Sequence, residues 1–183
     1  MAEKIKVKTG VVRFSYVHVF EPRSVNGSDE KYSVCLLIDK KDKATVNAIQ
    51  DAMKSIYEAE KNGAFKGKSF NAIKKPLRDG DDERSDDSNY AGMYFLNASS
   101  KTQPGVIDRA KNALDEDTFY SGCFGKAVLM LSAYNVSGGI GIAAYVNNIL
   151  KTDDGERLAG QASAESDFAD DLSDEEDDED LLG

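Results

Sequence analysis

Two apolar runs joined by a polar turn stand out between residues 120 and 148. From Ala127 to Tyr134 every second residue shares a face, a period typical of a strand with two different sides. The turn Asn135–Gly139 ends in two glycines, and a second apolar run returns over Ile140–Ile149. The pattern predicts a β-hairpin. Its arms carry Tyr134 and Tyr145, whose flat rings could face nucleic-acid bases.

Three further stretches have strand patterns. Residues 4–20 alternate, with lysines between apolar side chains and a break near Thr9 and Gly10. Lys31–Asp39 has a continuous apolar centre, which indicates a strand buried on both faces. Tyr90–Asn97 is predicted to be another strand.

One amphipathic helix is predicted over residues 42–62. Its apolar residues recur at helical spacing, so they share one face and are expected to pack in the core. Asp42 is a suitable cap for the start, and Gly63 for the end. Residues 64–89 are charged and carry glycines, and a loop of this length is usually functional or mobile.

The elements together indicate a mainly β protein. About five strands, one helix and a glycine-rich closing hairpin favour an OB-fold-like five-stranded antiparallel barrel with one amphipathic helix. The OB-fold is an architecture that commonly binds oligonucleotides.

Charge divides the chain into two parts. The net charge is −10, but eleven of the 33 acidic residues lie within 164–183, where Lys and Arg do not occur. The remaining 22 acids nearly balance the 23 Lys and Arg. We therefore predict a domain over residues 1–163 and an acidic, disordered tail over 164–183.

Composition argues against several kinds of chemistry. A single histidine, His18, makes a nucleophile–histidine triad improbable, and two separated cysteines argue against a zinc site. No cofactor and no metal are expected. The charged N-terminus and the lack of a long apolar run suggest neither a signal peptide nor a membrane span, and we expect a cytoplasmic protein. The acids within Asp79–Asp87 remain an alternative magnesium site, although arginines interrupt them.

Aromatic rings beside cations are the remaining signal. On a β scaffold such pairs favour a groove in which cations neutralise phosphates and rings stack on bases. The candidate DNA-binding residues are Arg13, Tyr16, Phe65, Lys66, Lys68, Phe70, Lys74, Lys75, Arg78, Lys101, Lys126, Tyr134 and Tyr145.

Four long stretches carry a resemblance to a known family. They read TGVVRFSYVHVFEP (9–22), KKPLRDGDDE (74–83), YFLNASSKTQPGVIDR (94–109) and YSGCFGKAVLMLSAYNVSGGIGIAAYVNNILK (120–151). The chain resembles the bacteriophage single-stranded DNA-binding proteins, over about residues 5–168. The resemblance implies an OB-fold, sequence-tolerant binding of single-stranded DNA, and work in phage replication or recombination within an infected bacterium.

The tail is expected to compete with DNA and to recruit replication or recombination proteins. Its candidate contact residues are Phe168, Asp174, Glu175, Glu176, Asp177, Asp178, Glu179, Asp180, Leu181 and Leu182. No membrane partner is expected, and homo-oligomerisation is left open. Two other functions compete with this hypothesis: a metal-dependent nuclease using the 79–87 acids, and an acidic DNA mimic that binds another protein.

Overall fold

The computed structural model describes residues 4–24 and 29–158. The proposed boundary at 163/164 and all the predicted tail contacts lie outside the described residues. The strands are β1 (Lys4–Lys8), β2 (Val12–Arg23), β3 (Lys31–Asp39), β4 (Leu77–Asp79), β5 (Met93–Ser100), β6 (Gly105–Ile107), β7 (Phe124–Val136) and β8 (Gly139–Asp153). The helices are α1 (Lys43–Glu60) and α2 (Gly80–Glu83), with short 3₁₀ turns η1 (Phe70–Ala72) and η2 (Ser88–Tyr90). None of the helices in the described part is long and apolar enough to cross a membrane.

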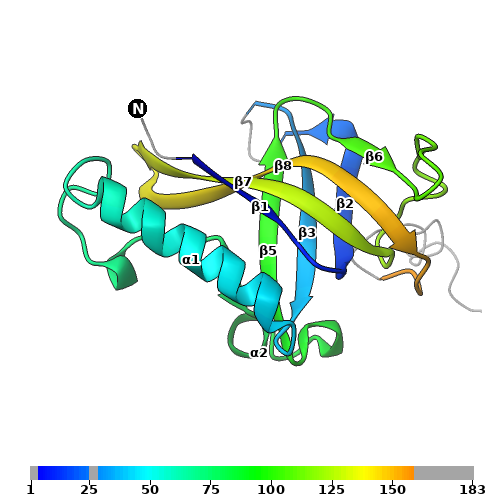
Figure 1. Cartoon of the computed structure of the whole chain (residues 1–183), viewed down its shortest axis with the longest axis horizontal. Helices are drawn as coiled ribbons and strands as arrows, with labels where there is room; N and C mark the ends of the chain where they lie inside the picture. The colour runs from blue at the N-terminus through cyan, green and yellow to red at the C-terminus, as the bar shows by residue number, and fades with distance from the viewer. Residues whose placement is uncertain (1–3, 25–28, 159–183) are drawn as a thin grey trace, which may run out of the picture.

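The prediction of a mainly β fold is confirmed, and the strand pairings trace a closed ring (Figure 1). β2 pairs with β3, β3 with β5, β5 with β8, β8 with β7, and β7 again with β2. Five strands therefore surround one core, as in an OB-fold. The prediction was an antiparallel barrel, but the pairing of β5 with β8 is parallel. Three further strands in the described part, β1, β4 and β6, pair at the outside of the ring. β1 was predicted as the segment before the break at Thr9 and Gly10, whereas β4 and β6 were not predicted.

Alternation along the strands determines which side chains enter the barrel. Ala127, Leu129 and Leu131 of β7 are buried in the main core, and the residues between them lie on the outer face. The predicted hairpin is confirmed, with Val136 opposite Gly139 at its end. The centre of β3 is buried on both faces as expected. Leu36 lies in the main core, whereas Leu37 belongs to a smaller cluster on the outside.

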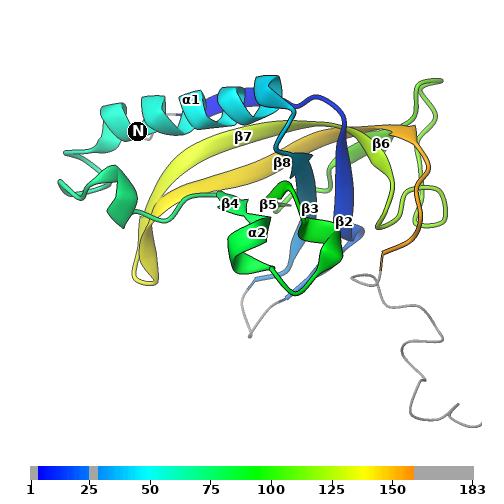
Figure 2. The ribbon, with the colours of Figure 1, turned by 90° about the horizontal axis from the view of Figure 1, so that it is seen from below.

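Helix α1 confirms the helix prediction and closes the barrel core from one side. Its buried face includes Val46, Ile49 and Ile56, which belong to the same cluster as Leu129 and Leu131 of β7. The Asp42 carboxylate accepts a hydrogen bond from the Thr45 N–H at 3.2 Å, which caps the first turn. Figure 2 shows α1 running along β1 and β7, away from the β4–α2 segment. The outer face of the sheet is therefore left uncovered by this helix.

The segment between α1 and β5 is structured rather than a free loop. It contains η1, β4, α2 and η2, and three of its side chains, Phe65, Ile73 and Tyr90, are at most 4% exposed. Burial of these apolar side chains compensates for the entropy of ordering the segment. The sequence prediction of a long loop was wrong here, because the few apolar residues that are buried lie far apart among charged residues and form no recognisable period.

Candidate nucleic-acid interface

A groove lies on the outer side of the barrel, between the β7–β8 arm and the β4 segment. Its volume is about 620 Å³, and Lys74, Lys75, Arg78, Asn97 and Tyr134 contribute to its lining. Figure 2 shows the β7–β8 arm curving down beside β4 and α2. We call this the first groove. Four of its lining residues are predicted site residues, whereas Asn97 was missed.

The backbone of Lys74 is fixed against the edge of β8. Its N–H donates to the Ile140 carbonyl at 3.0 Å, and the Ile142 N–H donates to its carbonyl at 2.9 Å. This approach requires glycine at the opposing position, because a Cβ on Gly141 would lie 2.4 Å from the Lys74 carbonyl oxygen. The exposed side chain of Lys74 donates to the Gly138 carbonyl at 3.2 Å, so the cation sits beside the hairpin turn.

The two other cations of the first groove are held by different partners. Lys75 Nζ donates to the carbonyls of Phe70 (2.8 Å) and Ile73 (3.0 Å) and lies 4.9 Å from the centre of the Phe70 ring. These contacts give Lys75 a partly structural role, and burial lowers its pKa. Arg78 binds Glu83, and hydrogen bonding to Glu83 raises the pKa of Arg78. A phosphate would therefore compete with Glu83 for this guanidinium.

Tyrosine rings occupy neighbouring positions on the outer face. Tyr134 is half-buried in the first groove, and its pKa is raised by burial and by the nearby Tyr145. Tyr145 is 39% exposed and is paired in register with Ser99 of β5. Because paired residues point to the same side, Tyr145 shares the outer face with Asn97, two residues before Ser99.

Tyr16 projects from a bulge in β2. Val12 and Phe14 enter the core, and so do Val17 and Val19, so the strand contains one extra residue between the two pairs. Tyr16 is 45% exposed and has a φ of 47°, a left-handed conformation that is unusual for a bulky residue. Strained residues of this kind cluster at functional sites, and the bulge directs this ring away from the core.

The remaining predicted residues are dispersed, and two need correction. Phe65 is fully buried and stacks on Tyr57 with centroids 6.0 Å apart, so its ring is not available to a base. Arg13 does not line the first groove: its Nη2 donates to the Glu156 carbonyl at 2.7 Å and its Nε to the Gly122 carbonyl at 3.1 Å. The others lie outside the first groove, on the α1–β4 connection (Lys66, Lys68, Phe70), after β5 (Lys101) and on β7 (Lys126).

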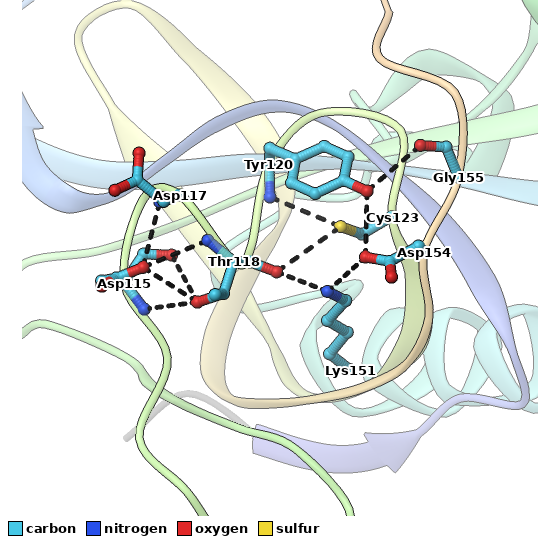
Figure 3. Close-up of polar contacts among 8 residues, drawn as sticks. All are labelled: Asp115, Asp117, Thr118, Tyr120, Cys123, Lys151, Asp154 and Gly155. Atoms are coloured by element: carbon cyan, nitrogen blue, oxygen red, sulfur yellow. Dashed lines mark hydrogen bonds and ion pairs between the residues drawn. The ribbon is translucent and has the colours of Figure 1, made fainter.

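Arg13 instead helps to hold residues Asp154–Leu158, which we call the C-terminal strap. Figure 3 shows its start: the Tyr120 hydroxyl donates to Asp154 at 3.0 Å and to the Gly155 carbonyl at 3.2 Å, and Lys151 donates to Asp154 at 2.6 Å. The hydrogen bond from Lys151 is the main reason that the pKa of Asp154 is lowered. The strap ends with Leu158 buried in the small outer cluster. The chain therefore leaves the described domain on the outer face of β3 and β5.

Three of the acids proposed for a nuclease bind protein cations instead. Lys40 Nζ lies 2.7 Å from both Asp79 Oδ1 and Asp81 Oδ2, and Arg78 pairs with Glu83. Hydrogen bonds from Lys40 lower the pKa values of Asp79 and Asp81. Among residues 4–24 and 29–158, no group of three or more His, Cys, Asp or Glu is arranged to hold a metal ion. These acids stabilise the β4–α2 turn.

Comparisons with known proteins show which family the chain belongs to. A family model described as "Enterobacter phage Enc34, ssDNA-binding protein" matches residues 5–182. The putative protein p50 of Acyrthosiphon pisum secondary endosymbiont phage 1 is 32% identical, over 96% of this chain and 98% of its own length. The solved single-stranded DNA-binding protein of bacteriophage Enc34 in complex with ssDNA has a TM-score of 0.72 at 26% identity, covering 84% of this chain and 89% of that chain.

A more distant neighbour supports the fold alone. Gp2.5, a single-stranded DNA-binding protein encoded by bacteriophage T7, has a TM-score of 0.59 at 14% identity, over 86% of this chain and 97% of that chain. The family model and the solved Enc34 protein are both named as single-stranded DNA-binding proteins and not as enzymes. The match over almost the whole chain identifies it as a member of the Enc34 family of phage single-stranded DNA-binding proteins.

Proposed function

We propose that this chain binds single-stranded DNA without sequence preference along the outer face of the barrel. The observation that carries the proposal is the first groove, where Lys74, Arg78, Asn97 and Tyr134 meet beside the exposed ring of Tyr145. Every base has a face that can stack on a tyrosine, so such a surface tolerates any sequence. The solved complex of the Enc34 protein with ssDNA supports this function.

The proposed division of work follows from exposure and partners. Lys74 and Arg78 neutralise phosphates, and Tyr16, Tyr134 and Tyr145 stack on bases. Asn97 is exposed in the lining of the groove and donates hydrogen bonds to sugar or base oxygens. A double helix hides its base faces, so the same surface favours single strands.

A titration tests the proposal directly. A fluorescent oligonucleotide is titrated in single- and double-stranded form at several salt concentrations. We expect tighter binding of the single strand, with log K falling against log salt by about 0.7 for each phosphate neutralised. Equal affinity for the duplex, or an affinity that does not depend on salt, contradicts the proposal.

We further propose that the chain acts in phage DNA replication or recombination and that the acidic tail competes with DNA and recruits partner proteins. The place where the strap ends supports the competition, because Leu158 lies on the same outer face as the exposed rings. Deleting 164–183 should then raise the affinity for single-stranded DNA at low salt, and the gain should shrink at high salt. An unchanged affinity at low salt contradicts a competing tail.

Two simple measurements separate the alternatives. A nuclease requires Mg²⁺-dependent cleavage, which the ion pairs of Lys40 with Asp79 and Asp81 oppose. A DNA mimic would bind another protein and leave single-stranded DNA unbound in the titration. Neither alternative accounts for a groove that combines cations with tyrosine rings.

A further inference from the structure

A second groove lies on the outer face of the barrel, away from Lys74 and Arg78. Its volume is about 280 Å³, and it is formed by the four neighbouring strands β6, β8, β7 and β1. Figure 1 shows β6 and β1 beside the β7–β8 pair. Its lining includes Ile107, Val128 and Leu150, together with Lys8 and Lys126.

The strand register arranges these side chains in two rows. Ile107 of β6 pairs with Leu150 of β8, which pairs with Lys126 of β7. In the next row Gly105 pairs with Asn148, Asn148 with Val128, and Val128 with Lys8. Ile107 and Leu150 therefore lie towards β6 and the two lysines towards β1, with Val128 directly opposite Lys8.

The apolar and the charged side chains of the second groove both lack partners within the described part of the chain. Ile107 is 40% exposed, although it is a large apolar residue. Within residues 4–24 and 29–158, Lys8 and Lys126 form no ion pair. A ligand that fits this surface has apolar groups next to several negative charges.

The end of this chain has that chemistry. Seven consecutive acids, Asp174–Asp180, precede Leu181 and Leu182. The fifteen residues between Leu158 and Asp174 span roughly 20 Å as a flexible chain. The Leu158 N–H donates to the Ser121 carbonyl, and Lys126 is five residues after Ser121, which is at most about 17 Å along the chain. The segment therefore reaches the second groove of its own domain.

We propose that residues 174–182 dock in the second groove, with Leu181 and Leu182 against Ile107 and Leu150. The acids then surround Lys8 and Lys126. This inference deepens the tail part of the proposed function by giving the tail a site of its own. Tyr145 precedes Asn148 along β8 and pairs with Met130, the residue opposite Lys6, so the docked tail covers cations next to an exposed ring. A DNA strand that extends past Tyr145 displaces the tail from these lysines.

Nuclear magnetic resonance of the full-length protein without DNA tests the docking. Amide shifts are compared between the wild type and the double variant Leu181→Ser/Leu182→Ser at low salt. We expect the amides of Ile107, Val128 and Leu150 to shift in the variant and, on adding salt, in the wild type. Unchanged shifts at these amides, or changes confined to Lys74 and Asn97, overturn the proposal.

A matched pair of variants in the domain gives an independent readout. Ile107→Ser should move the Leu181 and Leu182 resonances to the positions of a free peptide of residues 174–183. Val136→Ser, also at an exposed apolar position (61%) but at the hairpin turn, should leave them in place. Shifts that vary on dilution overturn the assignment to the same chain, because they require a second copy.

DNA binding is measured separately, so the two proposals fail independently. If the protein binds single-stranded DNA but the variants cause none of the expected shift changes, only the docking in the second groove is refuted. If the variants cause the expected shift changes but the protein binds no DNA, only the proposed function is refuted.

Discussion

The backbone of Tyr16 predicts that one substitution changes stability and DNA binding differently. A non-glycine residue in the left-handed region costs about 1–2 kcal/mol, and glycine avoids most of that cost. Tyr16 has a φ of 47° and is 45% exposed, and the glycine and alanine variants lose the same ring contacts, so their difference in stability reports the backbone strain. We therefore expect Tyr16→Gly to be more stable to urea than Tyr16→Ala by about 1 kcal/mol.

Both variants should bind DNA more weakly to a similar extent. Tyr16 lies two strands from Asn97 of the first groove, because Ser15 pairs with Cys35 and Cys35 with Asn97, a separation of about 10 Å. Loss of one stacked base costs about 1–3 kcal/mol, which corresponds to a rise in Kd of roughly 5- to 150-fold. Tyr16→Phe keeps the ring and should bind nearly as the wild type does.

Urea denaturation and fluorescence anisotropy with a labelled single strand measure the two effects. The reasoning on strain is refuted if the glycine and alanine variants unfold at the same urea concentration. The reasoning on stacking is refuted if Tyr16→Ala binds as tightly as the wild type while remaining folded.

Three other predictions follow from the geometry. Lys74→Gln should reduce the slope of log K against log salt by about 0.7, whereas Lys54→Gln on the exposed side of α1 should not change it. Gly141→Ala should destabilise the fold by roughly 1–3 kcal/mol in thermal unfolding, because its Cβ would meet the Lys74 carbonyl, and Gly138→Ala, with nothing within 4 Å, should not. Burial raises the pKa of Cys35 to about 11 from 9.0, so the folded state keeps a proton that the unfolded state releases. The stability should therefore fall by about 2–3 kcal/mol between pH 9 and 11, and Cys35→Ala should flatten that slope in urea titrations at each pH.

Local periodicity predicted the individual elements well. The hairpin, the helix and the buried strand β3 all depend on contacts between near neighbours, which a period of two or 3.6 reports directly. The parallel pairing of Ser99 with Tyr145 could not be predicted in this way, since it depends on how distant segments close the ring. The break predicted at Thr9 and Gly10 does separate β1 from β2, whereas the same limit explains why the short strands β4 and β6 were not predicted.

The candidate site was predicted less completely than the fold. A ring beside a cation has the same sequence pattern in a core and on a surface, which is why Phe65 was misassigned. The backbone carbonyls that bind Arg13 lie more than a hundred residues away, so its structural role was hidden. Asn97 and the lysines of β1 could have been found by following one face of each strand across the predicted sheet.

The closed ring also affects how the protein folds during synthesis. β2, β3 and β5 precede residue 101 and can pair early. One edge of β2 stays unpaired until Gly125 of β7 is synthesised, and part of one edge of β5 stays unpaired until Ala144 of β8 is synthesised. Until β7 and β8 leave the ribosome, both edges offer unpaired backbone groups to other nascent chains. Contacts of such long sequence separation also slow folding. When the protein is overexpressed, lowering the temperature should therefore raise the fraction that folds into closed barrels and lower the fraction that aggregates.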